Sequence, residues 1–154
     1  MLTEEERNAI LKAAERYPKK IAASVEALKI VQAARGWVPD AEIKEIAQVL
    51  DLDPSQVDGV ATFYSAIFRR PVGRHVIMLC DGISCWVMRY EDIADRLRTV
   101  LGIGFGETAP DNRFTLLPVS CLGLCEQAPA MIIDSDVHGN LTVEKIDGIL
   151  KKYE

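Results

Sequence analysis

Four cysteines in two close pairs constrain the fold of this 154-residue chain more than any other feature of its sequence. Cys80 and Cys85 stand in CDGISC, and Cys121 and Cys125 stand in CLGLC, so the pattern reads C-x4-C, then 35 residues, then C-x3-C. Each pair comes at the end of an apolar run, RHVIMLC or RFTLLPV, of the kind that forms a buried strand. A fold of this chain must therefore place both pairs at the ends of strands.

Before these strands, the sequence up to about residue 70 predicts short helices only. A capping-box pattern opens a first helix in TEEERNAI. Apolar residues then recur at helical spacing through residues 19–36 and 43–50. Asp53 followed by Pro54 marks the start of a fourth helix, because aspartate caps helices and proline suits their first position. We predict a helical bundle over residues 1–70.

The pattern changes after RRPVG, which is the best candidate for a linker. The next segments predict a strand in RHVIMLC, a helix in YEDIADRLRTVLG and strands in RFTLLPV and AMII. DVHGNLTV is predicted as a turn into a last strand, and EKIDGILKKY as a closing helix. A strand, crossover helix and parallel strand followed by a hairpin and a helix is the thioredoxin-like arrangement. We therefore predict an α+β chain whose residues 71–154 form a thioredoxin-like α/β domain.

In this arrangement the two cysteine pairs meet at one edge of the sheet, because the carboxyl ends of parallel strands lie together. A structural zinc ion is one possible occupant, although its ligand pairs are usually closer in sequence. A 2Fe-2S cluster divides its thiolates between two irons and accepts wider spacings such as C-x4-C. The spacing favours the cluster and leaves zinc open.

Two other uses of the cysteines are less well supported. A thioredoxin-type reactive dithiol would need C-x-x-C at the start of a helix, and neither pair has this spacing. His75 and His138 are not expected as ligands, because four cysteines already complete a metal shell.

Charge and composition limit the partners of the chain. The formal net charge is -5, which argues against a nucleic-acid partner because phosphates require a basic face. The N-terminus is acidic and lacks a secretory pattern. No apolar run approaches the roughly 18 residues of a membrane span, so no direct membrane insertion is expected. We expect a cytoplasmic protein, a compartment in which four cysteines seldom form structural disulfides.

Four segments together resemble a known family: ASVEALKIVQAARGWVPD, GVATFYSAIFRRPVGRHVI, CDGISC and FTLLPVSCLGLCEQAPAMII. They are similar to the thioredoxin-like 2Fe-2S subunit of the NADH dehydrogenase module of respiratory complex I, the 24 kDa family of NADH:quinone oxidoreductase. The resemblance runs through nearly the whole chain from about residue 20. In particular, it implies that Cys80, Cys85, Cys121 and Cys125 are the cluster ligands.

The resemblance also implies a function. It implies a one-electron carrier that is not catalytic alone and that exchanges electrons with FMN on a flavin subunit, which also binds NADH. The other partners would be further complex I subunits, and the chain would lie at the inner membrane only through that complex. Related subunits serve NAD-linked hydrogenases and formate dehydrogenases, so the parent complex stays open. A structural zinc-binding interaction module remains the alternative of another class.

Two residues depart from the pattern of this family. Arg89 stands where many members have glycine, and Asn112 stands where Asp-Gly is common. Asparagine tolerates a left-handed backbone conformation well, so Asn112 should be harmless. If the backbone at residue 89 requires a positive φ, the arginine there should reduce the local fit.

Overall fold

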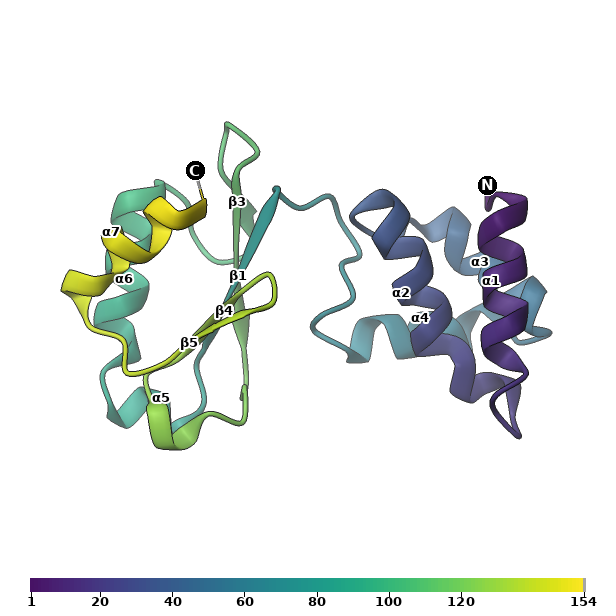
Figure 1. Cartoon of the computed structure of the whole chain (residues 1–154), viewed down its shortest axis with the longest axis horizontal. Coiled ribbons are helices and arrows are strands. Elements are labelled where there is room, and N and C mark those ends of the chain that lie inside the picture. Colours follow the sequence, from purple (N-terminus) through teal and green to yellow (C-terminus); the bar gives the residue numbers. More distant parts are fainter. Residues whose placement is uncertain (154) are drawn as a thin grey trace. The chain divides into compact units, whose positions relative to one another are not determined.

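A computed structural model of the chain describes residues 1–153 (Figure 1). The chain forms two compact units, Met1–Pro71 and a second unit that begins at Val72. Each unit has its own cluster of buried apolar side chains. The predicted order of helices first and a mixed sheet second is confirmed.

The first unit contains four α-helices and a short 3₁₀ turn. Thr3 and Asp53 cap their helices through capping boxes completed by Glu6 and Gln56, as the sequence indicated. Gly36 ends the second helix with a φ of 80°, a left-handed conformation that glycine adopts without strain. The elements are α1 (Glu4–Ala14), η1 (Lys20–Ala23), α2 (Ser24–Arg35), α3 (Asp40–Leu50) and α4 (Pro54–Phe63).

The apolar stripes of these helices meet in one core. Its fully buried large side chains come from α1, α2 and α3, and Val57 of α4 is buried against them. Spacing by three and four residues places such side chains on one face of each helix, and burying them together stabilises the unit. These large residues are Ile10, Leu28, Ile46 and Leu50.

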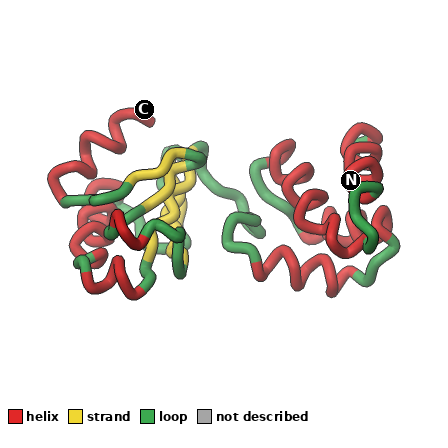
Figure 2. Tube along the Cα trace, turned by 60° about the horizontal axis from the view of Figure 1, so that its bottom comes forward, coloured by secondary structure: helices red, strands yellow, loops and turns green. Residues whose placement is uncertain are grey.

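The second unit is built on a five-stranded sheet with the order β2-β3-β1-β4-β5. β1 and β3 are parallel, and the other pairs are antiparallel. The helices α6 and α7 lie together on one face of the sheet (Figures 1 and 2). The strands are β1 (His75–Cys80), β2 (Glu107–Thr108), β3 (Phe114–Val119), β4 (Met131–Ile133) and β5 (Asp136–His138). The helical segments are α5 (Ile83–Val87), α6 (Tyr90–Leu101), η2 (Cys125–Gln127), α7 (Val143–Leu150) and η3 (Lys151–Tyr153).

The register of the parallel pair decides where the site forms. Cys80 stands opposite Val119, so β1 and β3 end at the same edge of the sheet. β1 is the central strand, and its neighbours β3 and β4 cover both of its edges. The segments that follow β1 and β3 therefore start side by side, which positions both cysteine pairs.

The predicted position of the last turn was wrong. The turn lies at residues 134–135, because Ile133 pairs with Asp136 and the strand follows at once. Asp134 takes a φ of 55°, and its carboxylate accepts a hydrogen bond from the Val76 N–H at 2.9 Å. Aspartate suits such a turn since it tolerates the left-handed conformation better than most residues. Among residues 1–153, no helix is long and apolar enough to cross a membrane.

Candidate metal centre

The four cysteines of the sequence come from two neighbouring segments at the end of the parallel strands. Cys80 is the last residue of β1, and Cys85 lies in α5 directly after it. Cys121 follows the end of β3 by two positions, and Cys125 opens η2. The first pair is buried and the second pair is exposed. The site is thus half inside the unit and half at its surface.

Backbone hydrogen bonds fix the buried half. The Cys80 N–H donates to the Ala130 carbonyl at 3.1 Å, and the Asp81 N–H donates to the Val119 carbonyl at 3.0 Å. The chain that leaves β1 is therefore tied to β3 on one side and to the segment before β4 on the other. In the exposed half, the Gly123 N–H donates to the Cys121 sulfur at 3.3 Å.

Gly82 allows the two cysteine segments to touch. A Cβ atom at this position would lie 2.6 Å from the Ser120 carbonyl oxygen and 3.5 Å from the Cys80 sulfur. The Gly82 dihedral angles, φ -61° and ψ 163°, are open to any residue, so glycine is required here by close approach alone. The glycine in CDGISC was visible in the sequence, but its contact with Ser120 was not.

The buried pair is suited to binding a metal and unsuited to thiol exchange. Burial raises the pKa of the Cys85 thiol to about 11, and a hydrogen bond with Cys80 acts in the same direction. A reactive thiol needs a lowered pKa and access to solvent, so Cys85 should not exchange disulfides. A metal ion overcomes such a pKa because its binding displaces the proton.

The all-sulfur donor set fits a cluster with two irons. Within residues 1–153, no three His, Cys, Asp or Glu side chains lie close enough to hold a single ion. A 2Fe-2S cluster asks for two thiolates at each iron. The buried pair and the exposed pair can serve one iron each, and Cys125 is close enough to Cys85 to raise its pKa electrostatically.

The two histidines lie elsewhere in the second unit. His75 begins β1, at the opposite end from Cys80, and its Nδ1 is 2.6 Å from the Asp134 carboxylate. His138 hydrogen-bonds through Nε2 to the Tyr153 hydroxyl at 2.8 Å. Burial lowers the pKa of His138. Both side chains are therefore engaged away from the cysteines.

Arg89 and Asn112 both adopt the left-handed conformation. Their φ angles are 64° and 54°. Residue 89, where the resemblance led us to expect glycine, thus has a positive φ in this chain. The Arg89 guanidinium makes an exposed ion pair with Asp92, with Nε 2.7 Å from the carboxylate. Such a pair contributes little, so it does not offset the backbone cost.

Replacing Arg89 by glycine is expected to stabilise the second unit. Arg89→Gly should raise the free energy of unfolding by about 1 kcal/mol relative to Arg89→Ala, because a left-handed conformation costs an L-residue roughly that much. Arg89→Ala is the matched control, since it removes the same ion pair but keeps the Cβ atom. Urea denaturation of the loaded chain measures the difference. If the glycine variant is no more stable than the alanine variant, the left-handed backbone at residue 89 is not strained.

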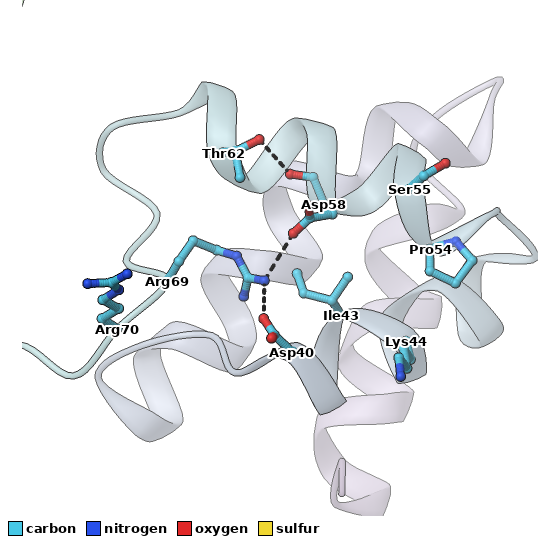
Figure 3. Close-up of a pocket in the computed structure, with 9 residues that line it drawn as sticks. All are labelled: Asp40, Ile43, Lys44, Pro54, Ser55, Asp58, Thr62, Arg69 and Arg70. Carbon is cyan, nitrogen blue, oxygen red and sulfur yellow. Dashed lines mark hydrogen bonds and ion pairs between the residues drawn. The ribbon is translucent and has the colours of Figure 1, made fainter.

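A hollow of about 630 Å³ in the first unit is a structural feature and not part of this site (Figure 3). Arg69 lies between two carboxylates there, 2.6 Å from Asp40 and 3.0 Å from Asp58. The same guanidinium donates to the Val38 carbonyl. Its charge is thus used to hold the start of α3 against α4.

Two thiol pairs at the end of a parallel strand pair, on a sheet with this topology, fit the class of thioredoxin-like metal proteins. The family model of the thioredoxin-like [2Fe-2S] ferredoxins matches residues 10–154, and the chain belongs to this family. Membership decides between the two occupants that the sequence left open, in favour of a 2Fe-2S cluster over zinc.

Individual relatives resemble the chain over almost its full length. The E subunit of NADH-quinone oxidoreductase from Pseudomonas aeruginosa is 50% identical over 153 residues, which are 99% of this chain and 92% of that protein. The protein of the same name in Escherichia coli is 52% identical with the same coverage. A solved NAD+-reducing [NiFe]-hydrogenase is also similar, with a TM-score of 0.67 and 25% identity over 82% of this chain and 22% of that chain.

Proposed function

We propose that this chain is the E subunit of an NADH-quinone oxidoreductase and that Cys80, Cys85, Cys121 and Cys125 are the ligands of its 2Fe-2S cluster. The observation that carries the proposal is that the segments bearing the two cysteine pairs leave β1 and β3 at the same edge of the sheet. The identity of 50% and 52% to proteins of that name supports the parent complex. When bound, the cluster accepts and donates one electron at a time.

The chain's own residues shape the site for this task. Cys80 joins the site to the central strand, and the exposed pair leaves one side accessible. Electron exchange needs such an accessible side, because the partner's cofactor must come close. Cys121 and Cys125 are therefore on the side from which we expect electrons to arrive, from FMN held by a flavin-bearing subunit.

Hydride chemistry belongs to that partner in this proposal. The sequence has no dinucleotide-binding fingerprint and no flavin motif, so the chain alone should not oxidise NADH. A role as the equivalent subunit of an NAD-linked hydrogenase is the second candidate, and the similarity to a hydrogenase structure supports it. The higher identity to the quinone-linked subunits favours the first. In either complex the chain would be cytoplasmic, and in the first it would reach the inner membrane only through its partners.

The test is a reconstitution. The loaded chain alone should leave NADH unoxidised, and adding the flavin-bearing subunit should allow NADH to reduce the cluster. Reduction is followed by loss of the visible cluster absorbance and by the EPR signal of one spin-half centre. NADH oxidation by the pure chain would contradict the assignment of NADH oxidation to the flavin-bearing subunit. Full binding of the partner without reduction of the cluster would contradict the proposed electron exchange.

A further inference from the structure

Gly123 and Gly82, the two glycines of the metal site, are glycines for different reasons. The φ of Gly123 is 74°, in the left-handed region that glycine enters without strain. A Cβ atom at residue 123 would meet nothing within 4 Å, whereas a Cβ atom at residue 82 would lie 2.6 Å from a backbone oxygen. Packing therefore leaves room for a side chain at residue 123, and only the backbone conformation there favours glycine.

This left-handed conformation directs the Gly123 N–H at a thiol of the metal site. The N–H donates to the Cys121 sulfur at 3.3 Å, two residues back along the chain. Cys121 is exposed, and Gly123 is exposed with it. The donor is thus held in place by the backbone angles of one residue and by no packing around it.

The buried half of the site has a sulfur ligand with a backbone donor of its own. Burial raises the pKa of the Cys85 thiol, and a backbone hydrogen bond with Ala130 acts in the opposite direction. Ala130 is completely buried, and its carbonyl accepts from the Cys80 N–H, so the sheet fixes its position. Of the two donors, the N–H of Gly123 is the one whose direction a single surface residue controls.

A hydrogen bond to a ligand sulfur favours the reduced state of an iron-sulfur cluster. Four thiolates and two sulfides around two ferric ions have a formal charge of -2, and the incoming electron adds one more negative charge. An N–H group aimed at a ligand sulfur stabilises the more negative state more strongly, so it raises the reduction potential. A backbone donor that is already oriented does this without the reorientation that water requires.

We propose that Gly123 raises the reduction potential of the cluster through the N–H that its left-handed backbone directs at Cys121. The inference rests on the proposed function and adds a residue that controls the potential at which this electron carrier works. Gly123 is a positioning residue in this role, because it acts through the sulfur of Cys121 and binds no iron itself.

Substitutions at residue 123 test the conformation separately from packing, because a side chain there meets open space. Asparagine adopts the left-handed conformation readily, and β-branched residues are outliers in it. In redox titrations of the loaded full-length chain, Gly123→Val should disfavour reduction about tenfold, which lowers the potential by about 59 mV. Gly123→Asn should keep the N–H in place and change the equilibrium less than about twofold, or about 18 mV.

Gly123→Thr is the matched control for the valine variant. Threonine has the same branched shape and avoids the left-handed conformation equally, but it carries a hydroxyl in place of a methyl group. Both variants should therefore lower the potential to a similar extent. A lower potential in the valine variant alone would assign the effect to exclusion of water by apolar surface, and would overturn the proposal.

Pulsed EPR of the reduced cluster gives a readout that does not depend on the stability of the variants. A native chain labelled with a nitrogen isotope in its glycines should show coupling between a glycine nitrogen and the unpaired electron. The same label in the Gly123→Asn chain should give a weaker glycine signal, since Gly82 still contributes and residue 123 does not. Identical glycine signals in the two chains would show that the Gly123 N–H does not bind the sulfur, even if the valine variant loses its cluster.

The outcomes separate this inference from the proposed function. A native chain that assembles no 2Fe-2S cluster would overturn both. If the native chain holds the cluster and the loaded Gly123→Val and Gly123→Thr chains keep its potential, the role of Gly123 is wrong and the proposed function stands. Iron and sulfide analysis of every variant ensures that only loaded chains are compared.

Discussion

Cys121→Ala and Cys125→Ala chains are expected to be purified almost without iron. Each substitution removes one of four thiols, and the sequence holds no other cysteine to replace it. Alanine offers no donor atom, so one iron would lose half of its protein ligands. We expect less than about a tenth of the native cluster content, because losing a group that merely supports a ligand already costs about 10–100-fold in metal affinity. Iron and sulfide analysis and visible absorbance measure it.

Because these two cysteines are exposed, a loss of iron in either variant can be attributed to the missing ligand and not to unfolding. Cys121 and Cys125 are at the surface, so removing either sulfur should leave the metal-free fold within about 0.5 kcal/mol of its native stability. Ser120→Ala is the matched control, because its exposed side chain neighbours Cys121 and its substitution removes no ligand. A Cys121→Ala chain with a full cluster would show that another group binds the second iron.

Gly82→Ala should damage both the fold and the site. Its new methyl group would lie 2.6 Å from the Ser120 carbonyl oxygen, which belongs to the backbone and cannot turn away. Overpacking of this kind costs about 2–3 kcal/mol. The cheapest relief separates the two cysteine segments, so we expect a lower free energy of unfolding together with a lower iron content.

A second glycine provides the control for that variant. Gly148 lies inside α7, where a Cβ atom would meet nothing within 4 Å. Gly148→Ala should therefore stabilise the chain by about 0.5–1 kcal/mol, since alanine is the better helix former. Urea denaturation and iron analysis of both variants complete the test. Equal stability and iron content in Gly82→Ala and native chains would show that the segments do not need this close approach.

Much of this architecture could be predicted because it depends on local patterns. The apolar runs that end at Cys80 and Val119 predict strands, and a crossover helix between them predicts a parallel pair. The placement of both cysteine pairs at one edge follows from that topology alone. The helix starts at Thr3 and Asp53 could be predicted for the same reason, because each cap lies within three residues of its partner.

The features that the sequence did not reveal are short or depend on distant contacts. β2 has two residues and α5 has five, which is too few for a periodic pattern. The last turn was misplaced because Gly139 and Asn140 were a stronger turn signal than Asp134, whose bond to the Val76 N–H joins residues 58 positions apart. The positive φ of Arg89 and the contact of Gly82 with Ser120 likewise depend on the folded chain.

The difference in exposure between the two cysteine pairs determines which thiols of the folded chain an incoming cluster can reach. Cys80 is held by hydrogen bonds of the central strand, so the fold itself fixes the backbone position of this residue. Cys121 and Cys125 remain at the surface of the folded chain. We therefore expect an incoming cluster to meet the thiols of Cys121 and Cys125 first, because the sulfurs of Cys80 and Cys85 are buried.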